Sequence, residues 1–354
     1  MLYLAVRGGE GRHILAGRNA HKVFLHAAAM LDLQVTWLCP QDQSSYHSCL
    51  LTPEDVEAAL SACADQPRAV YLTSPDYLGN MPDIAGIARV CHRHQVLLLV
   101  DNAHGAYLRF LPRSLFPMDL GADLCCSSAH KTLPAVTGAA YLHVREVDVP
   151  YARRALALFG STSPSYLILQ SLDLLNPYLE LLPSRLEAFL PSVRALRAAL
   201  TAHGYTLVGQ EEIKLTLLAS AAGFTGDELG EILRREGIWA EFHDPDYLVL
   251  MLTPENSIEE LQKLRSVLCS LEVRPALPRS LPPLTLPVQA MTPRQAVFAA
   301  SEEVPVEQAV GRVLAFADVG CPPAIPIVMC GEVIDEAAAA LFRYYGIQKC
   351  AVVI

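Results

Sequence analysis

Short apolar runs alternate with segments of helical period along the first half of the chain. Residues 96–100 form an uninterrupted apolar run that ends on Asp101 and small residues, which predicts a buried parallel strand with polar chemistry at its carboxyl end. Residues 69–73 and 137–144 indicate further strands, and residues 84–94 indicate the crossover helix before the Asp101 strand. This β-α-β order predicts an α/β fold built on a doubly wound, mainly parallel sheet.

The second half of the chain has a different pattern. A leucine- and alanine-rich helix is expected over residues 167–200, and a helix that starts near Thr225 ends at Gly237. Around that second helix, three apolar segments indicate strands, at residues 206–208, 214–218 and 247–252. This pattern predicts a smaller α+β C-terminal domain beside the large sheet.

Changes in composition divide the chain into three expected parts. Residues 1–160 form a large domain, and residues 161–274 form bridging helices with the small domain. A proline-rich linker over residues 275–287 then opens the last part, which covers residues 275–354.

Charge and cysteine usage narrow the class of protein. The 354 residues are 52% hydrophobic, with a mean hydropathy of +0.28 and a formal net charge of −10. An acidic chain lacks the clustered basic footprint of nucleic-acid binding and mildly favours cationic ligands. The ten cysteines show no C-x-x-C spacing, so we expect reduced thiols, no metal site and a cytoplasmic protein. We find no signal peptide and no apolar stretch long enough to span a membrane.

The candidate chemistry begins at Lys131, which lies among small and hydroxyl residues after an apolar run. An amine forms a Schiff base only when it is unprotonated, and a partly desolvated lysine is the residue best suited to this. Asp101 ends the upstream strand, where ligands of α/β sheets collect. Pyridoxal phosphate needs a lysine for its aldehyde and a carboxylate beside its ring nitrogen, and this pair supplies both. Considered separately, Lys131 is also compatible with an ordinary solvated lysine in a loop. Asp101 is likewise compatible with a helix cap or a turn residue.

Five segments, in the same order, resemble the pyridoxal-phosphate-dependent ornithine/lysine/arginine decarboxylases. They are Arg18-Asn19-Ala20-His21-Lys22, residues 73–79, Asp101-Asn102-Ala103-His104-Gly105-Ala106, Ser128-Ala129-His130-Lys131-Thr132-Leu133-Pro134, and residues 161–166. The segment Pro322-Pro323-Ala324-Ile325-Pro326, followed by Gly331-Glu332, is similar to the C-terminal signature of that family. The resemblance runs from about Leu2 to Ile354. It implies a pyridoxal-phosphate fold of the aspartate-aminotransferase type.

The resemblance also implies roles at the cofactor ring. Lys131 would hold the aldehyde, Asp101 would face the ring nitrogen, and His21 would stack on the ring face opposite Ala103. From its residue type alone, His21 also fits a histidine at a helix start that the backbone satisfies. His104 fits a proton-handling group and a structural hydrogen-bonder equally well.

Three further residues are implied at the phosphate end of the cofactor. Ser128 and His130 would contact the phosphate and cofactor region. Thr162 would reach the cofactor of the neighbouring subunit, so that a homodimer shares its active sites. A hydroxyl residue before Pro164 also serves as an ordinary helix cap, and both roles are compatible.

The activity that the resemblance implies is decarboxylation of lysine, arginine or ornithine to the corresponding amine and carbon dioxide. Two other classes stay open, namely another pyridoxal-phosphate activity such as an aminotransferase and a non-catalytic relative or partner subunit. In the relatives, a further segment precedes the part that corresponds to Met1 of this chain, and a turn in that segment holds the cofactor phosphate. A truncated chain, a misassigned start codon, half of a split enzyme and a degenerate relative all fit that difference.

Three acidic residues are assigned no catalytic role from the sequence. Asp76 departs from the usual threonine of the relatives, and Glu241 lies in a family-like segment that we interpret as structural. Glu332 is interpreted as a solvated glutamate rather than a group near the cationic end of a substrate.

Overall fold

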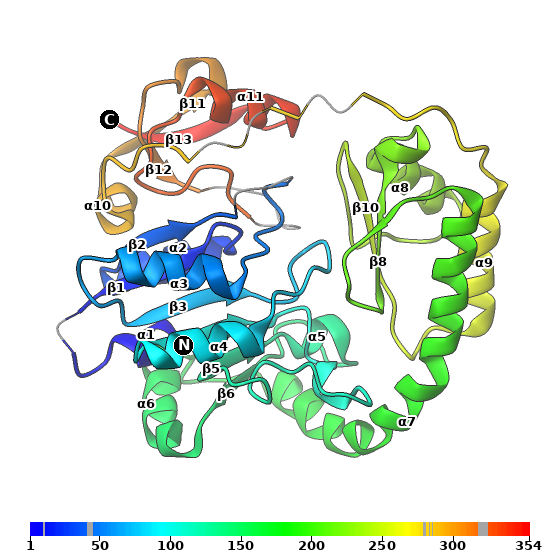
Figure 1. Cartoon of the computed structure of the whole chain (residues 1–354), viewed down its shortest axis with the longest axis horizontal. Helices are drawn as coiled ribbons and strands as arrows, with labels where there is room; N and C mark the ends of the chain where they lie inside the picture. Colours follow the sequence, from blue (N-terminus) through cyan, green and yellow to red (C-terminus); the bar gives the residue numbers. More distant parts are fainter. Residues whose placement is uncertain (10, 41–44, 279–280, 283, 285, 318–324) are drawn as a thin grey trace.

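The computed structural model describes residues 1–9, 11–40, 45–278, 281–282, 284, 286–317 and 325–354. Three sheets organise this part of the chain, and each has its own covering helices (Figure 1). Pro322, Pro323 and Ala324 of the C-terminal signature, and part of the proline-rich linker, lie outside the described residues.

The helices and strands predicted from the sequence form part of a longer series. The helices are α1 Leu2–Val6, α2 Lys22–Leu31, α3 Pro53–Ala62, α4 Ile84–Arg93, α5 Ala129–Thr132, α6 Val149–Phe159, α7 Tyr166–His203, α8 Gly226–Arg235, α9 Ile258–Ser270, α10 Pro293–Phe298 and α11 Glu336–Tyr344. The strands are β1 His13–Gly17, β2 Gln34–Leu38, β3 Ala69–Thr73, β4 Leu97–Asp101, β5 Leu124–Ser127, β6 Tyr141–Val144, β7 Leu207–Val208, β8 Lys214–Leu218, β9 Phe242–His243, β10 Tyr247–Met251, β11 Ser301–Pro305, β12 Leu314–Phe316 and β13 Lys349–Val353.

The main sheet has the strand order β2-β1-β3-β4-β5-β6. Strands β1 to β5 are parallel, and β6 pairs antiparallel with β5. Side chains alternate between the two faces, so Val70 and Val100 pack toward α3 and α4, whereas Tyr71 and Leu99 pack toward α1, α2 and α6. Both faces are therefore covered, which confirms the doubly wound, mainly parallel sheet.

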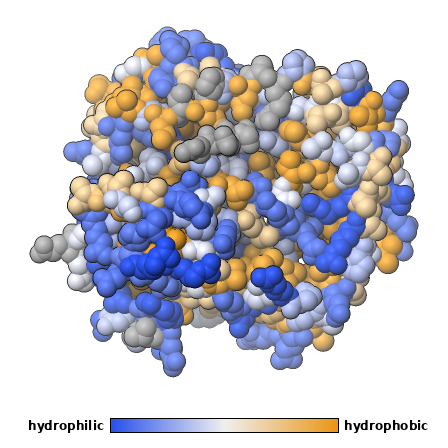
Figure 2. Space-filling view, in the orientation of Figure 1, coloured by the Kyte–Doolittle hydropathy of each residue, from blue (hydrophilic) through white to orange (hydrophobic). Residues whose placement is uncertain are grey.

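Local signals explain where the covering helices begin. Thr52 and Asp55 form a capping box at the start of α3, and Pro53 occupies the first turn, where its missing N–H costs no hydrogen bond. Asp83 caps α4, because its carboxylate accepts a hydrogen bond from the backbone N–H of Gly86. The outer side of α4 carries polar side chains, which appear blue over this helix in Figure 2.

One predicted strand is shorter than its pattern. Residues 137–144 were expected to be extended, but β6 begins at Tyr141. Gly138 has a φ of +96°, a backbone conformation that favours glycine, and the N–H of Ala139 bonds to the carbonyl of Val136. A turn therefore precedes the strand.

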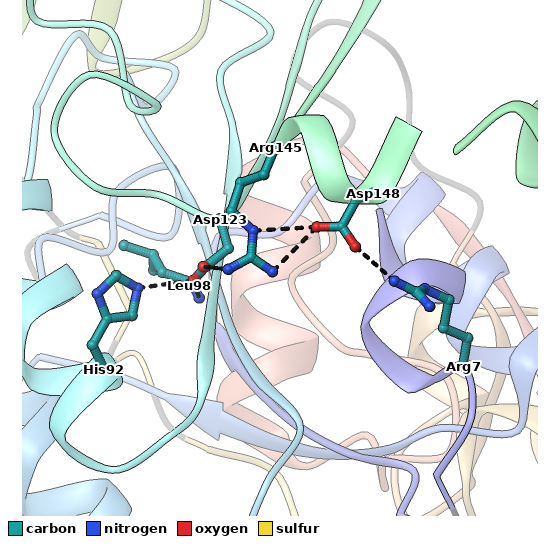
Figure 3. A network of polar contacts seen from close by, with 6 residues as sticks. All are labelled: Arg7, His92, Leu98, Asp123, Arg145 and Asp148. Carbon is teal, nitrogen blue, oxygen red and sulfur yellow. Dashed lines mark hydrogen bonds and ion pairs between the residues drawn. The ribbon is translucent and has the colours of Figure 1, made fainter. Parts of the chain in front are cut away.

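An ionic network ties the covering helices to the edge of the main sheet (Figure 3). The carboxylate of Asp123, just before β5, accepts hydrogen bonds from His92 and Arg145, each at 3.0 Å. Arg145 also binds Asp148 at 3.1 Å, and Asp148 accepts from Arg7 at 2.6 Å. The network fixes α1, α4 and the start of α6 around the sheet.

The smaller domain is an antiparallel sheet of order β7-β8-β10-β9 with α7, α8 and α9 packed on it. Helix α7 runs for 38 residues from the main sheet to this sheet, as Figure 1 shows. The C-terminal part is a third sheet, β11-β13-β12, with α10 and α11, and its core includes Leu25 of α2. This confirms the smaller α+β part of the prediction. None of the helices in the described part is long and apolar enough to cross a bilayer.

A buried ion pair joins the C-terminal sheet to the main sheet. Arg18 follows β1 and donates to both carboxylate oxygens of Glu332, at 2.7 and 2.8 Å, and to the carbonyl of Ile327 at 3.1 Å. Glu332 also accepts from the N–H of Met329 at 2.7 Å and is only 1% exposed. The interpretation of Glu332 as solvated is wrong, because its charge is matched by an arginine far away in the sequence.

We expect Glu332→Ala to lower the free energy of unfolding by about 3 to 5 kcal/mol, since it leaves the Arg18 guanidinium buried without its partner. Urea denaturation, followed by the fluorescence of nearby Trp37, measures this change. Lys349→Ala is the control, because it breaks the exposed pair with Glu303 and should cost about 1 kcal/mol or less. Equal losses in the two variants would contradict a structural role for the buried pair.

Candidate active site

The carboxyl ends of the parallel strands meet at one edge of the main sheet. Asp101 is the last residue of β4, while His21 lies in the segment that follows β1 and Lys131 in the segment that follows β5. The chain passes from β1 outward to β2 and returns to β3 on the other side, so the switch point of the sheet lies between β1 and β3. Ligands of such sheets bind at this edge.

Two short hydrogen bonds hold the Asp101 carboxylate, and the thiol of Cys126 makes a longer contact with Oδ1, at 3.7 Å. The phenol of Tyr71, on the neighbouring strand β3, donates to Oδ2 at 2.9 Å, and the N–H of Ala103 donates to Oδ1 at 3.1 Å. Burial and the nearby carboxylate raise the pKa of Tyr71 well above its usual range, so the phenol keeps its proton. Asp101 is therefore oriented by two donors that do not titrate near neutral pH.

His21 is the N-cap of α2. Its Nδ1 accepts a hydrogen bond from the N–H of Val23 at 3.2 Å, so the proton of the neutral ring is on Nε2. Burial lowers the pKa of His21, and the Asp101 carboxylate acts in the opposite direction. The result is an uncharged, flat ring near Asp101. The helix-cap reading of His21 is correct, and it leaves the ring available for stacking.

A cavity of about 390 Å³ opens beside these two residues. His21, Tyr71, Asp101 and Cys126 contribute to its wall, and the rest is mostly apolar, from α1, α2 and α6. Lys131 is not part of this wall.

Lys131 belongs to a row of three side chains. Its Nζ lies 2.9 Å from Nε2 of His104, and Nδ1 of His104 lies 2.5 Å from Nζ of Lys214. His104 and Lys214 are buried, at 5% and 2% exposure. Lys214 also donates to the carbonyls of Asp76 and Tyr77, at 3.2 and 3.5 Å.

Burial and neighbouring charges set the protonation of this row. Burial lowers the pKa of Lys214 to about 8, while the carboxylates of Glu211, Asp76 and Glu241 act in the opposite direction. Burial and the two lysines lower the pKa of His104 well below its usual range, so the imidazole is neutral. The pKa values of Asp76 and Glu211 are raised by burial.

Sequence reasoning missed Lys214. The segment of residues 214–218 was correctly expected to be a strand, but its first residue received no role. A lone lysine at the head of an apolar strand is unusual, because a lysine is almost never fully buried unless it is paired. That pattern was the available signal, but the partner, His104, is distant in the sequence. Asp76 is also a site neighbour, since its backbone carbonyl accepts from Lys214.

In the part of the chain that the structure describes, the three residues expected near the cofactor phosphate, Ser128, His130 and Thr162, do not form a hydrogen-bonded group as Lys131, His104 and Lys214 do. Ser128 is the N-cap of the short helix α5 that carries Lys131, and its hydroxyl makes no capping bond. His130 uses Nδ1 to donate to the carbonyl of Ala139 at 2.8 Å. Thr162 lies in the exposed loop between α6 and α7. Within the described residues, no hydrogen bond joins these three side chains.

The residues present fit pyridoxal phosphate at its ring and aldehyde. A carboxylate held by two donors and an uncharged imidazole share a cavity of suitable size, and a lysine amine is held by His104 at the same edge. At the phosphate end, the chain offers the hydroxyl of Ser128, whose oxygen is not used in a helix cap.

Comparison with known proteins gives a consistent result. A family model described as Orn/Lys/Arg decarboxylase, major domain, matches residues 2–187, and the C-terminal domain model of the same family matches residues 281–350. An arginine decarboxylase of Halalkalibacterium halodurans is 31% identical over 95% of this chain and 73% of its own length. The uncharacterized protein YaaO of Bacillus subtilis is 30% identical, over 92% of this chain and 72% of its length.

Solved structures agree at the level of the fold. The lysine decarboxylase LdcF of Francisella novicida superposes with a TM-score of 0.78 at 16% identity, over 100% of this chain and 68% of that one. Lysine decarboxylase A of Pseudomonas aeruginosa gives a TM-score of 0.76 at 18% identity, with the same coverage.

The depressed pKa of Lys214 predicts a pH dependence of stability. Between pH values of about 8 and about 10, the folded state loses this proton while the unfolded lysine keeps it, so the free energy of unfolding rises with pH. The rise attributable to Lys214 is about 3 kcal/mol and should be absent in Lys214→Met. Urea denaturation across this range measures it. Lys263→Met, which replaces an exposed lysine, should behave as wild type. Parallel curves for wild type and Lys214→Met would show that Lys214 has an ordinary pKa.

Proposed function

Because the chain belongs to the Orn/Lys/Arg decarboxylase family, we propose that it converts a basic amino acid to the corresponding amine and carbon dioxide, with pyridoxal phosphate as its cofactor. The observation that carries this proposal is the placement of Asp101, His21 and Lys131 at one edge of the main sheet. Asp101 and His21 line one cavity there, and Lys131 is held at the same edge by His104.

When bound, pyridoxal phosphate supplies a ring that accepts the electron pair of the bond between Cα and the carboxylate. Asp101 would hold the proton on the ring nitrogen, and the Tyr71 hydroxyl keeps one carboxylate oxygen in place. His21 would cover one ring face, and its neutral form adds no charge next to the cationic ring. Lys131 would bind the aldehyde, and His104 orients its amine.

Arginine is the first substrate to test. The curated relatives named arginine decarboxylase, from Halalkalibacterium halodurans and Bacillus subtilis, are 31% and 30% identical to this chain. The solved structures named lysine decarboxylase are less similar in sequence, at 16 to 18% identity. The net charge of −10 is also compatible with a cationic substrate.

We expect the protein loaded with pyridoxal phosphate to release carbon dioxide from arginine, lysine or ornithine, and Lys131→Ala to lose this activity by a factor of at least about 10³. Carbon dioxide capture and chromatography of the amine product measure both outcomes. Lys349→Ala, which replaces an exposed lysine on β13, is the control and should keep wild-type activity. A keto acid product would indicate an aminotransferase instead. No turnover of any of the three amino acids would favour a non-catalytic relative.

We also propose that the active enzyme is a homodimer that shares its sites. Large apolar side chains of α6 and the start of α7 are solvent exposed in the single chain, and they flank the loop that carries Thr162; they are Leu156, Leu158, Phe159, Tyr166, Leu167 and Leu174, with exposures between 51% and 85%. Exposed apolar groups of this density are typical of a subunit interface. If a second subunit binds to this surface, Thr162 of one subunit would lie near the cofactor phosphate of the other.

Mixing two inactive variants tests the shared site. Thr162→Asp should lose activity, because it puts a negative charge near the cofactor phosphate. Unfolding and refolding Lys131→Ala with Thr162→Asp in equal amounts should restore about a quarter of wild-type activity, because half of the dimers are mixed and each has one intact site. The absence of recovery in a mixture shown to contain mixed dimers would contradict a shared site.

The cysteines support a reducing compartment, and we place the enzyme in the cytoplasm. All described cysteines are free thiols, including the neighbours Cys125 and Cys126. Burial raises the pKa of Cys91 to about 12 and of Cys330 to about 11, which keeps these thiols protonated and unreactive.

A further inference from the structure

Lys131, His104 and Lys214 have a hydrogen-bonding arrangement that restricts where protons can be. Each nitrogen of the His104 ring faces a lysine amine, Nε2 at 2.9 Å from Lys131 and Nδ1 at 2.5 Å from Lys214. A neutral imidazole has one N–H and one lone pair. It accepts a hydrogen bond from one ammonium group and donates to the other amine, which must then have a lone pair. Two ammonium groups do not satisfy this geometry.

We propose that Lys214 is a buried proton store for Lys131, and that His104 passes a single proton between them. The proposal rests on the proposed function in one respect. Only a lysine that reacts with an aldehyde has to lose its charge and later recover its proton. Lys214 acts through His104, so it is a positioning residue that sets the protonation of Lys131.

The transfer leaves the row with the same number of protons. In one arrangement, the Lys214 ammonium donates to Nδ1 of His104, and the Nε2–H of His104 donates to the lone pair of Lys131. In the other, the Nε2 proton has moved to Lys131 and a Lys214 proton has moved to Nδ1. One positive charge is present in both arrangements, and it moves from one lysine to the other as the tautomer of His104 changes.

The contacts of Lys214 favour the charge at its end of the row when no substrate is present. Its ammonium group has three acceptors, which are the carbonyls of Asp76 and Tyr77 and Nδ1 of His104. Burial lowers the pKa of Lys214 to about 8, and the carboxylates of Glu211, Asp76 and Glu241 oppose this shift. The ammonium form therefore predominates at neutral pH, but it gives up its proton more easily than an ordinary lysine does.

The other groups near the row also agree with this assignment. Tyr107 donates to Glu211, and the Tyr77 ring lies 5.6 Å from Nζ of Lys214, where it favours the cation. On the Lys131 side, His21 is neutral because burial lowers its pKa, and Asp101 is held by Tyr71. Among the described residues, no acidic side chain forms a salt bridge with Lys131, so its neutral form, with the lone pair accepting from His104, loses no ion pair.

The lysine amines themselves provide the test, because the chain has only five lysines. Nuclear magnetic resonance of full-length protein freed of cofactor and labelled with ¹⁵N at lysine Nζ distinguishes an amine with two protons from an ammonium with three. At neutral pH we expect Lys131 as the amine and Lys214 as the ammonium. In Lys214→Met, the Lys131 signal should change to an ammonium. Lys263→Met is the control and should leave both signals unchanged, since Lys263 lies on the exposed side of α9.

A Lys131 ammonium in the wild type at neutral pH would overturn the proposal, and so would a Lys131 amine that persists in Lys214→Met. If Lys214→Met does not fold, His104→Phe replaces it, because that variant removes the link between the lysines and should also give a Lys131 ammonium. The measurement uses neither cofactor nor substrate. A positive result with no carbon dioxide release would therefore reject the proposed activity alone, and the reverse pattern would reject the proton store alone.

Discussion

Parallel pairing of β1, β3, β4 and β5 is the constraint on which the site depends. It brings the ends of strands that are far apart in the sequence to one edge of the sheet, where Asp101, His21 and Lys131 lie. Helices on both faces hold this sheet in place, and the network around Asp123 fixes helices at the opposite, amino end of its parallel strands. The chemistry of the site therefore follows from the topology of the sheet.

Burial of charged groups then connects the three parts of the chain. Arg18 and Glu332 join the main sheet to the C-terminal sheet, and Lys214 and His104 join it to the small sheet. Each pairing satisfies a group that would otherwise be costly to remove from water. The contact between Lys214 and His104 also places a lysine of β8 on the far side of the His104 ring from Lys131, the lysine that we assign to the cofactor. The small domain thus contributes a buried charge to a site whose Asp101, His21 and Lys131 come from the large domain.

The sequence was most informative where the residues of one short segment are enough to predict the structure of that segment. The apolar run before Asp101 and the β-α-β order predicted the main sheet and its carboxyl edge. Lys214 and Glu332 could not be assigned in this way. Each owes its role to a partner more than a hundred residues away, His104 or Arg18, and only the packing of separate sheets brings them together. The shortened strand at Tyr141 was missed because a turn at Gly138 interrupts an apolar pattern.

The most direct test of the account is to identify the lysine that carries the cofactor. Borohydride fixes pyridoxal phosphate to the lysine to which it is joined, and peptide mass spectrometry then locates it among the five lysines of the chain. We expect the added mass on the peptide with Lys131 and on no other. The same mass on Lys214, which lies on the other side of His104, or on no lysine at all, would contradict it.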